Sequence, residues 1–283
     1  MPNRHLKADM WLLLATFFWG VTFVAVKDAM LYTSPLVFLG VRFLLAGLVL
    51  LPFCYTGLKK LSREGWRDGM LIGIFLFAGF AFQTVGLVHT TATRSAFITG
   101  MCVVLVPSLS VLILKTKSDG WQILGVIMAA AGLYFLSRPE AGGFNQGDLL
   151  TGLCAVSFAV EVVLVQKFTQ KHPPLDMIMV QIITTIVLSV LFVGILEKPH
   201  WHWSPSLLLD LAVTSLLATA GALVIQFYWQ RRTTATRAAI IYTMEPLFAA
   251  SFAFVLFGER LPMAGWLGAG MILAGTLTAE LGK

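Results

Sequence analysis

Long apolar stretches alternate with short polar ones along the whole chain. Apolar runs of seventeen or more residues lie near positions 10–26, 35–55, 69–88, 95–114, 121–137, 148–168, 175–195, 207–230, 238–257 and 263–281. At about 1.5 Å per residue, a helix of this length crosses a hydrocarbon layer of roughly 30 Å. The pattern predicts ten transmembrane helices, five in each half of the chain.

The two halves are copies of each other. Thr-Thr-Ala-Thr-Arg occurs at residues 90–94 and again at 233–237, and the match continues at the same spacing for about forty residues. It pairs Gln83 with Gln226, Met101 with Met244, Gly125 with Gly268 and Gly132 with Gly275, and a weaker match pairs Asp9 with Asp148 and Trp19-Gly20 with Phe158-Ala159. Because five is an odd number, the second copy enters the bilayer from the opposite side, as in many secondary transporters.

The predicted fold is therefore an all-α integral membrane protein of ten transmembrane helices, arranged as two inverted five-helix repeats. We expect the first repeat at residues 1–138 and the second at 148–283. Only a polar stretch with Gly142-Gly143 separates them, so we expect one joint bundle.

Composition and charge support a membrane protein and set its orientation. Hydrophobic residues make up 58% of the chain and charged residues 12%. Cytoplasmic loops retain positive charge, and with the N-terminus inside, fourteen Lys and Arg residues fall on the inner side and five on the outer side. We expect both termini in the cytoplasm and the chain in the inner membrane. The net charge of +6 then follows from topology, so nucleic acid is excluded as a partner.

Small residues mark faces where helices approach closely. Gly125 and Gly132 share one helical face, and Gly268 and Gly275 repeat that face in the last helix. Such faces pack helices together within a bundle or between two copies of a chain. A homodimer therefore stays open.

Three ionisable residues fall well inside predicted helices. Arg42 lies in the second helix, Glu161 in the sixth and Glu245 in the ninth. Charges inside a membrane are costly and are functional candidates by default. Two carboxylates close together hold one proton readily and two charges poorly, so this pair predicts a coupling proton or recognition of a cationic group. The alternative is that each has only a structural partner.

Neutral side chains extend the candidate site. Gln83 and Gln226 either bind a polar ligand or bridge helices, and Trp19 and Tyr242 either stack on an aromatic or cationic substrate or pack. Pro246 removes a backbone donor beside Glu245 and predicts a helix kink there.

Two further motifs favour structural roles. Thr93 and Thr236 precede Arg94 and Arg237 and are predicted to cap the helices that these arginines open. His200-Trp201-His202-Trp203 lacks a third ligand at zinc spacing and is interpreted as an interfacial anchor. The sequence predicts no metal site, no cofactor and no enzyme, because it holds no phosphate-binding glycine loop, HExxH motif or nucleophile elbow.

The chain resembles the drug/metabolite transporter superfamily and, within it, the EamA-type members with ten helices. The resemblance is carried by Phe18-Trp19-Gly20, Arg42-Phe43, the repeated segments 90–96 and 233–239, Glu245-Pro246 and Gly258-Glu259. It implies a bundle in which helices 1, 3, 4, 6, 8 and 9 surround the pathway, and export or exchange of small metabolites, amino acids among them. The first repeat departs from the pattern, with Cys102-Val103 in place of Glu245-Pro246.

These observations predict a secondary transporter that moves small organic solutes, amino-acid-like or aromatic and cationic compounds, by efflux or exchange. The alternative is a multispanning sensor or assembly factor that binds a ligand or partner without transport. That class predicts a soluble output domain or a long docking tail, and the ten spans leave no such stretch within the sequence.

Overall fold

The computed structural model describes residues 3–90, 92–137, 145–257 and 263–281, so Gly142-Gly143 and Gly258-Glu259 lie outside the described residues. The first half contains α1 (Asn3–Ala29), α2 (Pro35–Leu58), α3 (Arg63–His89), α4 (Ala92–Gly100), α5 (Cys102–Leu109), the π-helix η1 (Ser110–Leu114) and α6 (Gly120–Ser137). The second half contains α7 (Gln146–Phe168), α8 (Pro174–Leu196), α9 (Pro205–Val213), the π-helix η2 (Thr214–Gly221), α10 (Ala222–Gln230), α11 (Ala235–Tyr242), α12 (Glu245–Phe257) and α13 (Met263–Glu280).

The helices confirm the all-α membrane fold that the apolar runs predict. In the part of the chain that is described, seven spans are long and apolar enough to cross a membrane, and Gly120–Leu136 and Met263–Ala279 are shorter apolar helices. The predicted ninth span, residues 238–257, is divided between α11 and α12. All ten apolar runs of the sequence therefore coincide with one helix or with consecutive helices.

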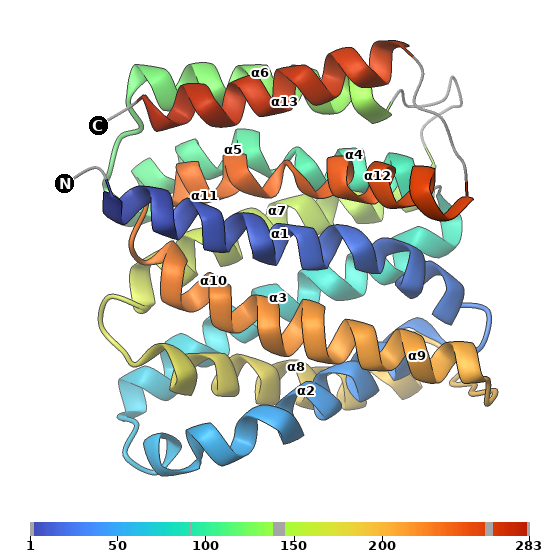
Figure 1. Cartoon of the computed structure of the whole chain (residues 1–283). Helices are drawn as coiled ribbons and strands as arrows, with labels where there is room; N and C mark the ends of the chain where they lie inside the picture. The colour runs from blue at the N-terminus through green and yellow to red at the C-terminus, as the bar shows by residue number, and fades with distance from the viewer. Residues whose placement is uncertain (1–2, 91, 138–144, 258–262, 282–283) are drawn as a thin grey trace.

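The two repeats run in opposite directions through one bundle (Figure 1). α1 begins at the end of the bundle that holds both termini, whereas α7 begins at the other end. We call the first the terminal end, where α1 begins and α13 ends, and the second the distal end, where α4 and α7 begin. The inversion predicted from the odd number of spans is confirmed.

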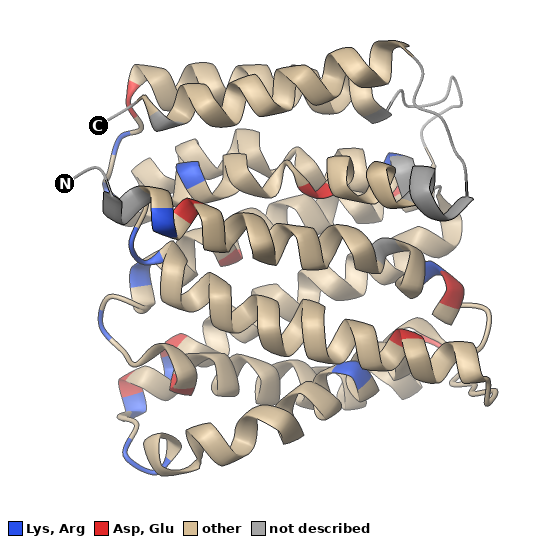
Figure 2. Cartoon of the chain, in the orientation of Figure 1, with Lys and Arg blue, Asp and Glu red and all other residues tan. Residues whose placement is uncertain are grey.

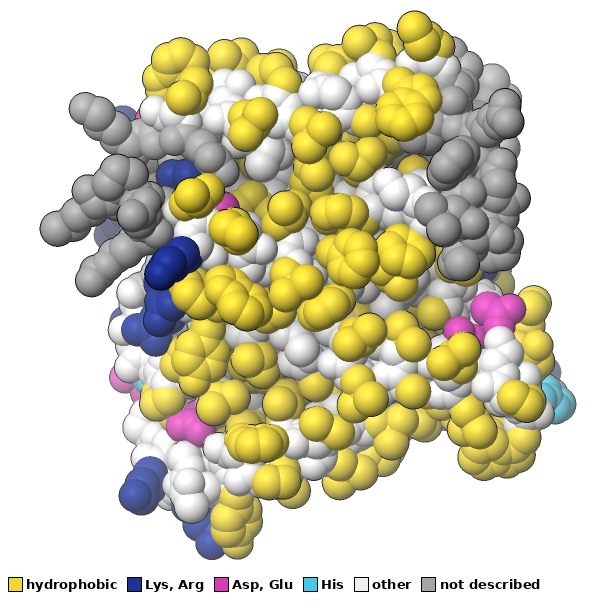
Figure 3. Space-filling model, viewed as in Figure 1, with side chains coloured by type: hydrophobic (Ala, Val, Ile, Leu, Met, Phe, Trp, Pro, Cys, Tyr) yellow, Lys and Arg dark blue, Asp and Glu magenta, His cyan; other side chains and the backbone are white. Residues whose placement is uncertain are grey.

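Charged and apolar side chains follow this axis. Lys and Arg gather mainly at the terminal end (Figure 2), and hydrophobic side chains cover the middle of the face seen in Figure 3. Many large apolar side chains of the described residues are exposed, such as Leu48, Val190 and Leu209. Exposed apolar surface between two polar ends matches a protein surrounded by lipid.

Glycines bring helices of the two repeats into backbone contact. A Cβ added at Gly125 would lie 2.7 Å from the carbonyl oxygen of Gly275, and one at Gly132 would lie 2.7 Å from that of Gly268. These glycines therefore pack α6 against α13 within one chain. The helix faces that the sequence allowed for either a bundle or a homodimer are used inside the bundle.

The fourth and ninth spans are each interrupted at the same repeat position. α4 ends at Gly100 and α5 begins at Cys102, with Met101 between them. α11 ends at Tyr242 and α12 begins at Glu245, and the turn between them contains Met244, the repeat equivalent of Met101. Broken helices at mid-membrane are tolerated where they line a cavity or are buried in protein.

Candidate functional site

A cavity lies between the two repeats and brings together all seven binding residues that the sequence proposes. Trp19, Arg42, Gln83, Glu161, Gln226, Tyr242 and Glu245 line it, together with Thr22, Val26, Leu76, Phe80, Leu87, Thr99, Gly100, Cys102, Phe158, Val162, Leu223 and Thr243. They come from spans 1, 2, 3, 4, 6, 8 and 9. The structure thus adds the second span, through Arg42, to the six that the family resemblance implies.

Arg42 of α2 is held in place by one hydroxyl and by the rings of Phe43 and Phe80. Its Nε donates to Thr219 Oγ1 at 2.7 Å, and its guanidinium lies over the Phe80 ring, 4.7 Å from the centroid. Thr219 belongs to η2, the π-helical part of the eighth span, and its hydroxyl also donates to the Thr214 carbonyl. No described residue hydrogen bonds with the two terminal nitrogens of Arg42, which therefore remain available to a ligand.

Glu245 supplies a negative charge to the same cavity. It is the first residue of α12, directly after the break in the span, and Pro246 follows it. Arg42 and Glu245 interact electrostatically without forming a direct ion pair. Within the described part of the chain, nothing hydrogen bonds with the Glu245 carboxylate, so two opposite charges face one cavity with room between them.

The backbone near Glu245 is positioned by Gly20 of α1. A Cβ at Gly20 would lie 2.7 Å from the Glu245 carbonyl oxygen and 2.8 Å from Phe248 Cβ. Only glycine allows α12 to approach α1 this closely. The Trp19-Gly20 pair in the sequence thus serves both the cavity and the helix contact beside it.

Glu161 of α7 has a partner of its own. Gln226 Nε2 donates to Glu161 Oε2 at 3.2 Å and to Gln230 Oε1 at 3.3 Å. Glu161 and Glu245 are not hydrogen-bonded to each other; the first binds Gln226 and the second faces Arg42. The pair of carboxylates sharing one proton, which the sequence allows, is not what this structure contains.

Trp19 and Tyr242 contribute an aromatic corner. Their rings meet edge to face with centroids 5.1 Å apart, and Trp19 Nε1 donates to the Ala218 carbonyl at 2.9 Å. Ala218 lies in η2, where the π-helical backbone frees carbonyls from regular helix bonding. The sequence indicates both rings but neither the π-helix nor Thr219, because no residue pattern marks a π-helix.

The cavity extends from the middle of the bundle toward the distal end. Val26 lies three residues before the end of α1 and Leu87 two residues before the end of α3, and both helices end at the distal end. Gln83 lies on the same side, and its Nε2 donates to Thr99 Oγ1 at 3.4 Å. Toward the terminal end, the lining stops at Glu161, Val162, Gln226 and Tyr242.

Two ion pairs related by the repeat lie beyond the cavity, one at each end. Arg94 Nη2 lies 2.7 Å from Asp148 Oδ2 at the distal end, and Arg237 Nη2 lies 3.0 Å from Asp9 Oδ2 at the terminal end. Each pair joins the first helix of one repeat to the fourth span of the other.

The cap at the start of α11 differs from the prediction. Thr236 was expected to cap it, but Thr234 Oγ1 accepts the bond from the Arg237 amide at 3.2 Å. The Thr236 hydroxyl instead lies 2.7 Å from that of Ser118. The side chain of Thr93 lies outside the described residues.

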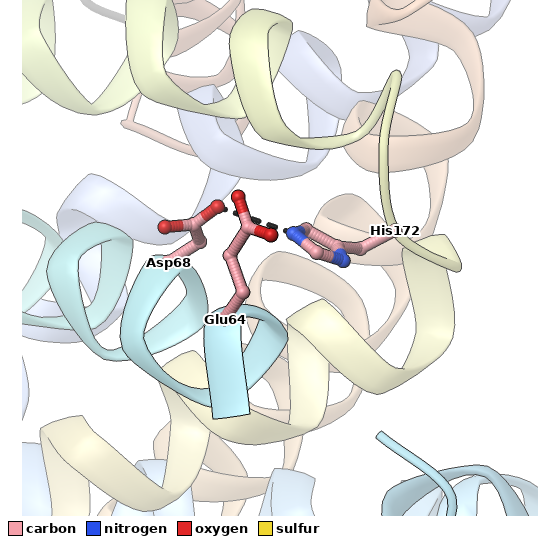
Figure 4. Close-up of side chains that lie close together, drawn as sticks. All are labelled: Glu64, Asp68 and His172. Atoms are coloured by element: carbon pink, nitrogen blue, oxygen red, sulfur yellow. Dashed lines mark hydrogen bonds and ion pairs between the residues drawn. The ribbon is translucent and has the colours of Figure 1, made fainter. Parts of the chain in front are cut away.

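A second polar cluster lies at the terminal end, where α3 meets the turn between α7 and α8 (Figure 4). His172 Nε2 lies 3.1 Å from Asp68 Oδ2, and Glu64 is on the same helix as Asp68. This is the one group in the described residues whose ligand atoms are close enough to share a metal ion. Arg67 lies 2.8 Å from Asp68 and Lys171 lies 3.7 Å from Glu64, so cationic side chains already neutralise both carboxylates.

Comparison with known proteins gives matches along the whole chain. The EamA-like transporter family matches residues 6–138 and again residues 145–279. An uncharacterized transporter of Archaeoglobus fulgidus is 35% identical over 98% of this chain and 87% of its own length. An S-adenosylmethionine uptake transporter of Rickettsia bellii is 27% identical over 83% of this chain and 80% of its own length. A crystal structure of a protein with 19% identity covers 97% of this chain and 96% of its own, with a TM-score of 0.82, which supports the fold.

Proposed function

Because the chain belongs to the EamA-like transporter family, we propose that it is a secondary transporter whose cargo is a small amino-acid-like zwitterion. The relatives are named transporters, one of them an S-adenosylmethionine uptake transporter, and this supports a small-solute transporter. One observation carries the choice of cargo: Arg42 and Glu245 face the same cavity with opposite charges and no direct ion pair.

A zwitterion satisfies both groups at once. A substrate carboxylate accepts hydrogen bonds from the free guanidinium nitrogens of Arg42, which suit a carboxylate. A substrate ammonium binds the Glu245 carboxylate across the cavity. Charged groups inside a membrane are costly unless paired, so a ligand that pairs both is favoured over one that pairs only one.

The remaining lining favours an apolar or aromatic body on the substrate. Trp19, Phe158 and Tyr242 line the cavity beside the charges, whereas the Phe80 ring is already covered by Arg42. S-adenosylmethionine has the ammonium and carboxylate of an amino acid, together with a sulfonium cation and an aromatic base, and it appears in the name of the Rickettsia bellii relative. It is therefore the first compound to test, together with aromatic amino acids.

We further propose efflux by exchange with protons across the inner membrane, with both termini in the cytoplasm. The support is the concentration of Lys and Arg at the terminal end (Figure 2), which corresponds to the cytoplasmic side in membrane proteins. Glu161 and Glu245 are the carboxylates that line the cavity, so we assign the coupling proton to them.

Transport into liposomes tests the proposal. We expect purified protein to exchange labelled S-adenosylmethionine or aromatic amino acids, Glu245→Gln to abolish this exchange, and Glu64→Gln to leave it unchanged. Glu64 is a matched control because it is an exposed carboxylate outside the cavity. Exchange that is no faster than in empty vesicles for every amino-acid-like solute would refute the cargo class. If quaternary amines are carried and Arg42→Gln has no effect, the cargo is a cation.

A further inference from the structure

Four buried side chains close the cavity toward the terminal end. Gln226 Nε2 donates to Glu161 and to Gln230 Oε1, and Tyr242 Oη donates to Gln230 Oε1 at 3.0 Å. Gln230 Nε2 donates to the Val162 carbonyl at 2.6 Å. We call Glu161, Gln226, Gln230 and Tyr242 the closing layer. It links α7, α10 and α11 just where the lining of the cavity stops.

The repeat provides an internal comparison for this layer. The equivalent positions in the other copy all line the distal part of the cavity, and they are Thr22, Gln83, Leu87 and Thr99. Among these four described side chains, the structure has one hydrogen bond, from Gln83 to Thr99 at 3.4 Å. Leu87 replaces Gln230 and cannot form hydrogen bonds. The same positions thus make a connected hydrogen-bonded layer toward the terminal end and none toward the distal end, where Leu87 packs instead with Val26, Phe38 and Leu207 in an apolar cluster.

We propose that the closing layer is the terminal-end gate and that Glu161 is the proton-binding group that controls it. The proposal rests on the transporter function proposed above and adds the residues that couple a proton to opening. The ionised carboxylate of Glu161 only accepts hydrogen bonds, and it accepts them from the Gln226 amide. Hydrogen bonds to a charged acceptor are roughly twice as strong as neutral ones.

Protonation weakens this bond and, through it, the layer. It removes the charge and turns one carboxylate oxygen into a donor, which cannot bond with the amide nitrogen of Gln226. Gln226 is also one of the two donors to Gln230, so a displaced Gln226 leaves Gln230 held by Tyr242 and Val162 alone. The gate is therefore closed while Glu161 is ionised and released when it binds a proton.

Few titratable groups face Glu161 from the helices around it. Tyr242 of α11 and Cys102 of α5 interact with it electrostatically. The other charged groups on the packed helices lie nearer the helix ends: Arg63, Glu64, Arg67, Asp68 and His89 on α3, Arg94 on α4, Arg237 on α11, and Asp148 and Lys167 on α7 itself. Arg42 and Glu245 face the same cavity from α2 and α12. Glu161 is thus the carboxylate placed within the layer itself.

The direction of coupling follows from the side of the closing layer on which the cavity lies, which is the distal side. Protons reach Glu161 from the distal side, release the gate, and leave on the terminal side once the layer has parted. Ionised Glu161 then allows the layer to form again after solute has entered. One proton moves from the distal to the terminal side as one solute moves the other way.

A cysteine reporter tests the gate without any substrate. Val165 is fully buried beyond the layer and is the repeat equivalent of Val26, which lines the distal part of the cavity. In a variant in which Cys54, Cys102 and Cys154 are replaced, Val165→Cys is labelled with a membrane-impermeant thiol reagent from the terminal side of oriented vesicles. Thermal unfolding of each variant reports whether it is folded.

We expect labelling of Val165→Cys to rise about tenfold from about pH 8 to about pH 6, the change expected when a hydrogen bond to a charged group is lost. Glu161→Gln should show the higher level at both pH values. Gln230→Leu, which introduces the residue of its repeat equivalent, and Tyr242→Phe should raise labelling about fivefold at high pH, since each loses neutral bonds. Gln83→Leu is the matched control on the distal side of the cavity and should leave Val165→Cys labelling unchanged.

Labelling of Val165→Cys that is the same at both pH values and in Glu161→Gln would overturn the proposal. If Gln230→Leu fails to fold, Tyr242→Phe, which removes a single hydroxyl, decides the role of the layer. Transport with unchanged labelling contradicts the gate but not the carrier, whereas responsive labelling without transport of any solute contradicts the carrier but not the gate.

Discussion

The two repeats have kept equivalent residues at the ends of the bundle but not in its middle. At the ends, Arg94–Asp148 and Arg237–Asp9 are the same ion pair made twice. In the middle, the repeat equivalent of Glu161 is Thr22, that of Glu245 is Cys102 and that of Arg42 is Gln181. The frame has therefore been retained in both copies, whereas the charged groups of the cavity are each present in only one.

This difference explains how a bundle built from two similar repeats can bind a solute whose two ends differ. Two identical sites would bind a molecule equally well in either direction. A single Arg42 and a single Glu245 give the proposed zwitterion one orientation.

Replacing Arg42 by glutamine, the residue at its repeat equivalent, should have the largest effect. Loss of the guanidinium removes charged hydrogen bonds to the substrate carboxylate, so we expect affinity to fall by about 3 kcal/mol, on the order of a hundredfold. Equilibrium binding of labelled amino acid measures it. Gln181→Leu, on the equivalent helix outside the cavity, serves as the control, and equal losses in both variants would contradict a single-copy site.

Breaking either end ion pair should come next, and the two effects should match. Arg94→Gln and Arg237→Gln each leave a buried aspartate without its arginine, and we expect roughly 2 kcal/mol of lost stability in thermal unfolding. Arg94 is 16% exposed and Arg237 9%, so water lessens both losses. A large difference between the stabilities lost in the two variants would contradict the equivalence of the two ion pairs.

The glycine contact between α6 and α13 offers a smaller test. Gly132→Ala places a methyl group 2.7 Å from the Gly268 carbonyl, so the helices must separate, at a cost of about 1–2 kcal/mol. Gly270→Ala is the control on α13, because nothing lies within 4 Å of its added Cβ. The temperature of thermal unfolding should fall for Gly132→Ala and should stay level or rise for Gly270→Ala.

Lys115 should give the smallest effect. It ends η1 with a φ of 58°, in the left-handed region, and its repeat equivalent in the sequence is Gly258. Because glycine adopts this conformation without strain, Lys115→Gly should stabilise the protein by about 0.5–1 kcal/mol. Lys117→Gly, two residues further on, is the control in thermal unfolding and should not stabilise.

The sequence predicts the spans, the inversion and the composition of the cavity lining, because these depend on local hydrophobicity, an odd helix number and the cost of charge in lipid. Arg42, Glu161 and Glu245 stand out for that last reason. Their binding roles remain proposals.

Other parts depend on contacts that no local pattern reveals. Gln230 lies at the polar end of α10, where glutamine is unremarkable, and its place in the closing layer depends on α7 and α11 meeting it. Thr219, which accepts the hydrogen bond from Arg42, lies in the π-helix η2, and no residue pattern marks a π-helix. Pro246 explains a break beside Glu245, but the same break at Met101 occurs where the first repeat has Val103 instead of proline.

The interruptions at Met101 and Met244 change what a conformational switch requires of the fourth and ninth spans. When an unbroken helix tilts, both of its ends move. When a helix is interrupted near its middle, one half can move while the other stays packed against its neighbours. Each side of the membrane then has its own half-helix, and the two halves of a span need not move at the same time.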